Sequence, residues 1–402
     1  METTAFTNDE IQQFRAATRG TAGRIHFNNA GGALPPDAVI DPVIAYLQEE
    51  AYIGAYEAEY KYGDQLEQVY ALIAKLINAD VSEVAVVENA STAWMTAFRG
   101  ISFKPGDEVL VSELEYSTNL IGALQAKKIH GIVIKTAPHD EDGNFSLPAL
   151  EAAITPRTRM IAVTHIASGT GGMLPVAEIG EVAAKHNILY LVDACQSAGH
   201  VPLDVKAIHC DMLAATGRKY LRAPRGTGFL YVKKEILNQL EPLMMDGHST
   251  VAISPDSYTM RDDARRFELY EKNRALVIGL GKAIEYALHV DVARIWQRIQ
   301  LLSAQLREKL GTIPGVTIQD RGLLRSGIVT FSIKGIDSGS VKSRLLEKHI
   351  NVSMAMPRAT VIYMNKHHIT DVVRASVHYY NTEEEISILC AAVAAISQEY
   401  NG

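Results

Sequence analysis

Six short apolar runs, separated by amphipathic segments, constrain the fold more than any other feature of this chain. The runs are Val84–Val87, Glu108–Ser112, Gly131–Thr136, Met160–Thr164, Ile188–Val192 and Gly228–Val232. Such an alternation is typical of successive βαβ units. Because strands this apolar are usually covered by helices on both faces, we predict an α/β fold with a mostly parallel sheet flanked by helices.

The pattern changes near residue 275, where helices and strands become mixed. The elements predicted there are helices at 271–288, 292–310 and 339–348 and strands at 316–320, 327–333 and 372–379. A final helix begins at Thr382, which forms a capping box with Glu385 and precedes apolar residues at helical spacing. The sequence therefore predicts a smaller C-terminal α+β unit.

Length and composition are those of a globular protein of two domains. The 402 residues are 47% hydrophobic and 21% charged, unlike disordered or fibrous chains. At about 150 residues per domain, we expect a large α/β domain at 20–275 and a small α+β domain formed by 1–19 and 276–402.

The net charge of −7, with no Lys/Arg run, argues against a nucleic-acid partner. Without a recognisable signal peptide or membrane span, we expect a cytoplasmic protein with no membrane partner.

Cysteine usage excludes two further classes of protein. Cys195, Cys210 and Cys390 are the only cysteines, and none is spaced as Cys-x-x-Cys. Neither a disulfide framework nor a zinc ribbon can be built from them. We therefore expect no metal centre.

Two runs carry residues suited to chemistry. Asp193 stands at the C-terminal end of a fully apolar strand, which is the edge of an open α/β sheet where ligands bind. Taken alone, Asp193 could equally cap the next helix. The second run, Asp211–Tyr231, carries Lys219 among small and turn-forming residues. A Lys in such a loop is usually only solvated. Neither run is therefore decisive alone, and we interpret the two together.

Together these runs resemble the aminotransferase class V family of pyridoxal 5'-phosphate (PLP) enzymes. Members carry Asp-x-x-Gln after an apolar strand and a Lys before a Gly-rich strand, which here correspond to Asp193, Gln196, Lys219 and Gly226–Gly228. The resemblance implies PLP fold type I, with Lys219 bound covalently to the cofactor. Lys suits that task because its pKa falls when it is desolvated. The resemblance further implies that Asp193 faces the pyridine nitrogen and that Gln196 donates to the phenolic oxygen.

Four residues are candidates for binding the cofactor phosphate. Ser91 and Thr92 follow an apolar strand and open a helix, where free N–H groups and hydroxyls make an anion site. A plain helix N-cap is the alternative. Thr216 and Arg218 occupy positions where the family usually has Ser and His on the same phosphate. Arg218 departs from that pattern.

The remaining site candidates also follow from the resemblance. Tyr116 takes the place of the ring that lies over the cofactor, and with Lys219 and Asp193 it completes the predicted catalytic set; an ordinary half-buried Tyr is the alternative. Arg374 matches the Arg that holds the substrate carboxylate, which suits a two-pronged donor. Ser168 is expected at the cofactor. The substrate-facing entry segment corresponds to Asn29, Ala30 and Gly31.

Tyr52, Tyr56 and Tyr60 recur every four residues and so share one face of a helix. A core or dimer-interface stripe is favoured over a substrate cage, although aromatic rings bind ammonium groups. We keep Tyr56 as a candidate substrate contact. The family relation also implies a homodimer with its active site near the subunit interface.

The leading hypothesis for the reaction is β-elimination by a C–S lyase. The family's desulfurases carry sulfur on a loop Cys shortly before the carboxylate-binding Arg, yet the stretch 350–370 holds no Cys. The runs 165–175 and 266–271 look closer to the ergothioneine-pathway C–S lyases and isopenicillin-N-epimerase-like proteins. Lys219 would take the α-proton of an S-substituted cysteine or its sulfoxide, giving pyruvate and ammonia. We expect Cys195 to point away from the substrate side.

Two other classes of function stay open. An epimerase or aminotransferase would use the same first steps as the lyase. A non-catalytic relative that serves as a binding protein is also possible, because a fold does not guarantee chemistry.

Overall fold

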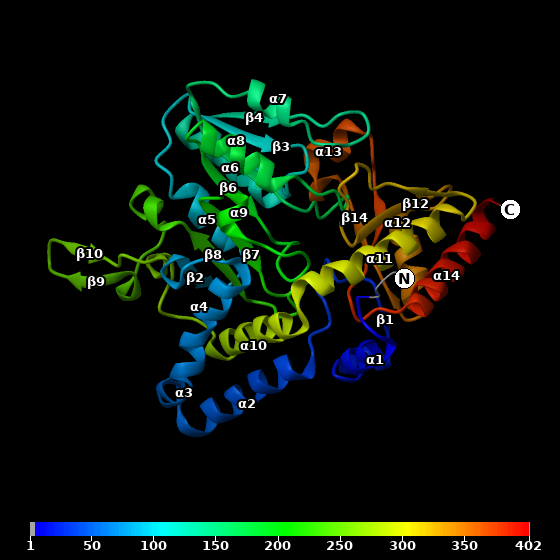
Figure 1. Ribbon diagram of the computed structural model, residues 1–402, viewed down its shortest axis with the longest axis horizontal. Helices are drawn as coiled ribbons and strands as arrows, with labels where there is room; N and C mark the ends of the chain where they lie inside the picture. Colours follow the sequence, from blue (N-terminus) through cyan, green and yellow to red (C-terminus); the bar gives the residue numbers. More distant parts are fainter. Residues whose placement is uncertain (1–4, 402) are drawn as a thin grey trace.

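Figure 1 shows the computed structural model, in which residues 5–401 are described. Residues 1–4, which belong to the predicted small domain, lie outside the described residues. The helices are α1 Asn8–Ala16, α2 Asp37–Ile53, α3 Ala55–Lys61, α4 Gly63–Ile77, α5 Ala90–Arg99, α6 Ser117–His130, α7 Leu147–Ala152, α8 Val176–Lys185, α9 Val205–Ile208, α10 Arg274–Val290, α11 Val292–Gly311, α12 Ser338–Glu347, α13 Val361–Lys366 and α14 Glu383–Asn401.

A seven-stranded sheet forms the centre of the larger part of the molecule. Its strands lie in the order β2-β8-β7-β6-β5-β3-β4, and β8 is the one strand that runs antiparallel to its neighbours. The bounds are β2 Val84–Val87, β3 Glu108–Ser112, β4 Val133–Ala137, β5 Thr158–Thr164, β6 Leu189–Asp193, β7 Met212–Thr216 and β8 Gly228–Val232. The prediction of a mostly parallel sheet is confirmed.

Helices cover both faces of this sheet because every central strand is apolar on both sides. In β2, Val84 and Val86 pack into the core that contains α4 and α10 residues, while Ala85 and Val87 pack toward α5 and Trp94. Successive strand residues point to opposite faces, so an unbroken apolar strand needs two helical layers. The C-terminal ends of the parallel strands are left as the edge on which side chains can gather.

The strand β7, at Met212–Thr216, is missing from the sequence-based prediction, which treated these residues as part of a small-residue turn. Every residue of β7 is buried between β6 and β8. Its centre is Ala214 and Ala215, residues of weak strand propensity. Burial between two strands and close packing of α5 against β7 decide the conformation here.

A second, four-stranded sheet lies beside α11, α12 and α14 (Figure 1). Its order is β11-β12-β15-β14, and every neighbouring pair is antiparallel. The bounds are β11 Val316–Ile318, β12 Ile328–Ile333, β14 Ser353–Ala355 and β15 Val372–Ser376. Predicted helices and strands in this part are found within a few residues of their predicted ends, although β15 ends at Ser376 rather than at 379.

The N-terminal segment reaches across to this second sheet. Strand β1 Ile25–His26 pairs in parallel with β13 Ile350–Asn351, and Arg15 of α1 forms an ion pair with Glu385 of α14. Helix α10 instead packs against α2 and α4 beneath the large sheet. The proposed domain limits at 20 and 275 stay a prediction.

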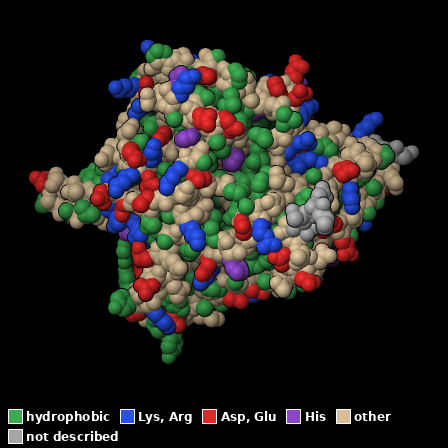
Figure 2. Space-filling model, viewed as in Figure 1, with side chains coloured by type: hydrophobic (Ala, Val, Ile, Leu, Met, Phe, Trp, Pro, Cys, Tyr) green, Lys and Arg blue, Asp and Glu red, His purple; other side chains and the backbone are tan. Residues whose placement is uncertain are grey.

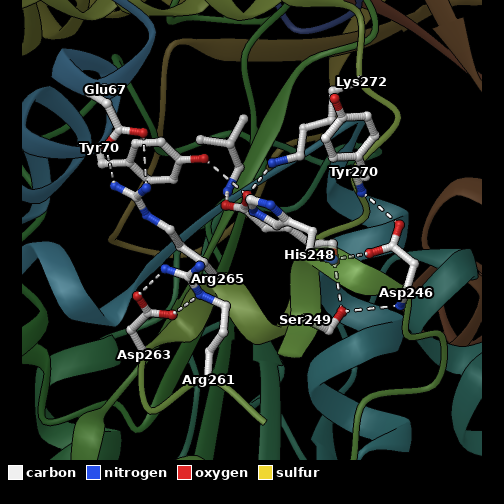
Figure 3. Close-up of polar contacts among 12 residues, drawn as sticks. Glu67, Tyr70, Asp246, His248, Ser249, Arg261, Asp263, Arg265, Tyr270 and Lys272 are labelled. Carbon is white, nitrogen blue, oxygen red and sulfur yellow. Dashed lines mark hydrogen bonds and ion pairs between the residues drawn. The ribbon is translucent and has the colours of Figure 1, made fainter. Parts of the chain in front are cut away.

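A β-hairpin of β9 Thr250–Ile253 and β10 Tyr258–Met260 projects from the molecule beyond the large sheet (Figure 1). Its base is fastened by Glu268, which is 1% exposed. The Glu268 carboxylate accepts hydrogen bonds from Tyr70 Oη at 2.9 Å, Val86 N at 2.6 Å and His248 Nε2 at 3.3 Å, and it pairs with Lys272. Figure 3 shows this cluster. Burial raises the pKa of Glu268, but the contacts from His248 and Lys272 outweigh it and the pKa is lowered.

Within residues 5–401, no helix is long and apolar enough to cross a membrane.

Replacing Glu268 by Ala should destabilise the protein by about 3–5 kcal/mol, because Lys272 and the Tyr70 hydroxyl would be left buried without their partner. Denaturant unfolding of the wild type and the variant measures this difference. The exposed Lys282–Glu285 pair supplies the control, and Lys282→Ala should change the unfolding free energy by less than about 1 kcal/mol. Equal effects of the two substitutions would show that Glu268 is not a fastening point.

Candidate active site

The candidate site lies at the C-terminal edge of the large sheet, as predicted for ligand binding in open α/β folds. Asp193 and Thr216 are the last residues of the neighbouring strands β6 and β7. Lys219 follows three residues after Thr216, in a loop that returns to β8. Strand ends that lie side by side thus bring residues distant in sequence into one site.

Lys219 is 6% exposed and forms no ion pair with a carboxylate in the described part of the chain. Burial lowers the pKa of its amine, and the cations Arg218 and Arg374 lower it further, against the opposing effects of Cys195 and Asp193. The Lys219 Nζ lies 5.9 Å from the ring centroid of Tyr116. The predicted neighbours Lys219 and Tyr116 are therefore brought together, and the amine is suited to nucleophilic attack on an aldehyde.

Asp193 is held from two sides. Its Oδ2 accepts a hydrogen bond of 2.8 Å from Asn119 Nδ2, and its Oδ1 accepts one of 2.8 Å from the backbone N of Cys195. Burial raises the pKa of Asp193, while these two hydrogen bonds and the charge of Lys219 act in the opposite direction. A cationic ring nitrogen placed against Asp193 would favour its ionised form.

Glu115 and Asn119 support Asp193, and the sequence reasoning assigned neither of them a role. Glu115 is 1% exposed and accepts hydrogen bonds from Thr164 N at 2.8 Å and from Asn119 Nδ2 at 3.3 Å. Burial, with a further contribution from the charge of Asp193, raises the pKa of Glu115 to about 7. A signal was present, since Glu115 and Asn119 flank Tyr116 at the start of α6, one helical turn apart.

Gln196 connects the large sheet to the N-terminal segment. Its Nε2 donates to Ala30 O at 3.1 Å and to Ser168 Oγ at 3.2 Å. Its Oε1 is buried without a hydrogen-bond partner among the described residues. Both amide hydrogens are therefore used, so donation to a cofactor oxygen requires one of these bonds to be exchanged. Gln196, Ala30 and Ser168 are nevertheless neighbours, as their predicted shared site requires.

Arg374, on β15 of the second sheet, reaches the site that contains Gln196 and Ser168. Its Nη1 donates to Ser168 O at 3.0 Å and to Ser168 Oγ at 2.9 Å, and its Nη2 lies 3.4 Å from Asn28 Oδ1. The residue is 7% exposed, its Nε has no partner, and no carboxylate pairs with it in the described structure. Burial lowers its pKa to about 10. A buried guanidinium without an anion is suited to bind a substrate carboxylate.

The predicted phosphate-binding residues are only partly arranged for that task. Helix α5 begins after Asn89, whose Oδ1 accepts a hydrogen bond of 2.9 Å from Thr92 N. Asn89 therefore caps the helix, and Ser91 is exposed. The Thr216 hydroxyl donates to Thr227 O at 3.3 Å, and Arg218 donates to Gly31 O. The phosphate roles of Ser91, Thr92, Thr216 and Arg218 stay predictions.

Asn29 and Gly31 have evident structural functions in the entry segment. Asn29 is fully buried, with its amide nitrogen 2.7 Å from Ser376 O and its amide oxygen bonded to the Tyr380 hydroxyl. A substrate contact from Asn29 would have to replace these bonds. A Cβ at Gly31 would lie 2.4 Å from Asn28 Oδ1, the atom that faces Arg374. Gly31 thus makes room for Asn28.

The prediction that Tyr52, Tyr56 and Tyr60 share one face of a helix is wrong, because Gly54 ends α2 after Tyr52, whereas Tyr56 and Tyr60 lie on α3. The Tyr56 side chain is 70% exposed, so it is not part of the core. It lines a cavity of about 400 Å³ together with Glu88 and Tyr270. Glu88 lies three residues before Ser91, one of the residues predicted to bind phosphate. The predicted substrate contact of Tyr56 stays a prediction.

Cys195 does not point away from the site as expected. Its thiol interacts with the Lys219 side chain, which favours the thiolate, although burial is the larger effect and raises the thiol pKa. Cys195 is partly exposed, whereas Cys210 and Cys390 are buried. The alternation of strand side chains does not apply here, because β6 ends at Asp193.

Glu115→Gln should gain stability relative to the wild type as pH rises from about 4.5 to 7. The raised pKa means that folded Glu115 keeps its proton over this interval while the unfolded chain loses it. The wild type therefore loses stability with rising pH through this group, and Gln cannot. Denaturant unfolding at several pH values measures the difference. Parallel curves for the two proteins between pH 4.5 and 7 would contradict the assignment.

Comparison with known proteins places these observations in a family. The aminotransferase class-V model matches residues 25–389. A probable cysteine desulfurase of Methanothermobacter thermautotrophicus is 34% identical over 372 residues, covering 91% of this chain and 92% of that protein. A probable cysteine desulfurase of Synechocystis sp. is 29% identical over 384 residues, covering 92% of this chain and 90% of that protein.

Solved structures agree with the fold. The apo structure of a cysteine desulfurase from Thermococcus onnurineus NA1 has a TM-score of 0.90 and 26% identity, covering 96% of this chain and 98% of that chain. A cystine C-S lyase in complex with cysteine persulfide has a TM-score of 0.85 at 24% identity, covering 94% of this chain and 99% of that chain. The latter likeness concerns the fold alone.

The residues present fit PLP, because a buried amine, a buried carboxylate and an unpartnered guanidinium nitrogen and amide oxygen converge at one sheet edge. The chain belongs to the aminotransferase class V family and is a PLP-dependent enzyme with the fold of the cysteine desulfurases.

Proposed function

We propose that this enzyme is a C–S lyase that carries out β-elimination on an S-substituted cysteine or its sulfoxide. When bound, PLP withdraws electrons from the substrate α-carbon. The α-C–H and Cβ–S bonds break, the sulfur leaves as a thiol or sulfenate, and hydrolysis of the released aminoacrylate gives pyruvate and ammonia. Similarity to proteins named cysteine desulfurases supports an amino-acid substrate related to cysteine.

Three residues of this chain have direct tasks in the proposal. Arg374 binds the substrate carboxylate, because it is a buried cation that lacks an anion. Lys219 Nζ takes the α-proton, for which its lowered pKa suits it. Asp193 would hold the cofactor ring nitrogen, and Tyr116, whose ring centroid lies 5.9 Å from Lys219 Nζ, would contact the cofactor ring.

The position of the cysteines is the observation that favours a lyase over a desulfurase. The stretch 350–370, where desulfurases of the family place their sulfur acceptor, contains Met354 and Met356 but no Cys. In this structure it forms β14 and α13. Lys366 of α13 pairs with the buried Glu113 at 2.7 Å, which fastens the segment beside the Tyr116 loop.

A desulfurase is the second candidate, because the named relatives favour it and because Cys195 interacts with Lys219. Cys195 would then accept the substrate sulfur as a persulfide. An epimerase or aminotransferase would share the roles given to Lys219 and Arg374.

We further propose a cytoplasmic homodimer. Large exposed side chains lie on α2 and α3 and on the projecting hairpin, where Tyr52 is 88%, Tyr60 91% and Ile253 82% exposed. Figure 2 shows hydrophobic side chains projecting at both places. A second copy of this chain is the occupant that such surfaces favour. Because Tyr56 shares a cavity with Glu88, the interface would lie near the predicted phosphate site.

Borohydride reduction of the holoenzyme followed by peptide mapping should place a pyridoxyl group on Lys219, the buried lysine of the site. Incubation with S-substituted cysteines should release pyruvate and ammonia in equal amounts. A label on Lys206 or Lys233 would overturn the site assignment. Keto-acid exchange or α-proton exchange without pyruvate would favour the aminotransferase or the epimerase.

Replacing each cysteine by Ala should leave turnover within about tenfold of the wild type, equivalent to roughly 1.4 kcal/mol of barrier. Cys195→Ala is the decisive variant, and Cys210→Ala and Cys390→Ala are buried controls. A loss of about a thousandfold in cofactor-loaded Cys195→Ala alone, or a persulfide trapped on Cys195, would establish the desulfurase instead.

A further inference from the structure

Two fully buried histidines, His200 and His378, lie on either side of Tyr220, the residue directly after Lys219. The His200 ring stacks on the Tyr220 ring with centroids 3.7 Å apart and planes at 19°. His378 Nε2 lies 3.0 Å from the backbone O of Tyr220. One histidine thus holds the ring of Tyr220 and the other holds its backbone.

The hydrogen bonds of His200 admit one protonation state. The backbone N of Gly327 donates to His200 Nε2 at 3.0 Å, so Nε2 carries no proton. Nδ1 therefore bears the proton and donates to Gln196 O at 3.0 Å. Burial, the largest cause, lowers the pKa of His200 to about 3, which keeps the ring uncharged.

His378 is held in the opposite tautomer. The backbone N of Tyr379 donates to its Nδ1 at 2.9 Å, so the proton lies on Nε2 and is donated to Tyr220 O. Burial, together with the cation Arg222, lowers the pKa of His378 well below its usual value. Both rings are thus neutral, and each uses one nitrogen as donor and the other as acceptor.

These bonds form a chain that links the cofactor side of the site to the substrate side. From Gln196 it passes through His200 to Gly327, which precedes β12. Gly327 O accepts from Val377 N at 3.0 Å, and the next residue, His378, leads to Tyr220. Arg374 lies on the strand that ends just before Val377 and pairs with Thr330 of β12.

Close approach at Gly327 shows how tightly α11 and the loop that carries His200 pack against the residue before β12. A Cβ there would lie 2.4 Å from Ile299 Cγ2 and 2.9 Å from His200 Nε2. Trp296 of α11 also contacts the His200 ring edge-on, with centroids 5.4 Å apart. The His200 ring therefore has a single position, set by the large sheet on one side and by elements of the smaller part on the other.

We propose that His200 and His378 are positioning residues that set the placement of Lys219 and Gln196 relative to Arg374. They join the groups that hold the cofactor, on the large sheet, to the group that holds the substrate carboxylate, on the small one. The inference rests on the roles proposed above for Lys219, Gln196 and Arg374. It adds that the uncharged imidazoles of His200 and His378 determine the position of these three residues relative to one another.

Four holoenzyme variants test this: His200→Leu and His378→Leu, which remove the ring bonds, and His200→Gln and His378→Gln. In Gln, the terminal amide stands near the place of Nε2, so it can accept from Gly327 N or donate to Tyr220 O. The control is His139→Leu, since His139 is buried but neither of its ring nitrogens has a hydrogen-bond partner among the described residues.

The readouts are the visible circular dichroism of the lysine-bound cofactor, its affinity, and the apparent Kd for L-alanine followed by cofactor absorbance. Both Leu variants should weaken L-alanine binding roughly tenfold or more and change the dichroism, because small misplacements are costly. Cofactor binding should persist, and the Gln variants should recover most of the loss. His139→Leu should leave dichroism and Kd unchanged.

Leu variants that change only the Tm would overturn the proposal and leave the histidines a packing role. Gln variants no better than Leu would also overturn it, because the hydrogen bonds would then be irrelevant. If a Leu variant fails to fold, the corresponding Phe variant takes its place, because Phe keeps a ring of similar size but has no hydrogen-bonding group. A wrong assignment of Lys219 would be seen separately, in peptide mapping of the wild type.

Discussion

The burial of the Lys219 amine without a carboxylate partner is the constraint on which the rest of the site depends. A Lys so enclosed is unfavourable as a cation, and the protein does not relieve this with an ion pair. The loop that carries Lys219 must therefore be held by contacts that do not neutralise its amine. Those contacts are the uncharged ring and backbone interactions of Tyr220, and they come from two different parts of the chain.

The same constraint explains the place of the N-terminal segment. Asn28, Asn29 and Ala30 run between the end of β15 and the Gln196 turn, and their backbone and side chains satisfy polar groups on both sides. This segment, which precedes α2, therefore forms part of the wall of the site.

Six of the seven strands of the large sheet and the sheet type could be predicted from the sequence, because apolar runs and the βαβ rule are local signals. Asp193 and Lys219 were identified in this way and through family resemblance. The partnership of Asp193 with Asn119 was not, since 74 positions separate them and only the packing of α6 against the sheet edge joins them. For the same reason Asn29 was assigned to the substrate, whereas its amide is committed to Ser376 and Tyr380. Strand β7 was missed because alanines carry little strand signal, and α13 because it is short.

The charges around Lys219 give a further reason why the site is built from both the large sheet and the second sheet. Lys219, Arg218 and Arg374 act on one another electrostatically, and each of the two arginines lowers the pKa of the Lys219 amine. Asp193 is the carboxylate that acts on the Lys219 amine in the opposite direction. Burial raises the pKa of Glu115, which supports Asp193, to about 7, so Glu115 is largely protonated below neutral pH. The site therefore carries more positive than negative charge and favours ligands that bring anions. A cofactor phosphate and a substrate carboxylate are two such groups. Because Arg218 lies in the loop after β7 of the large sheet and Arg374 on β15 of the second sheet, the two cations come from different parts of the fold and can bind separate anions.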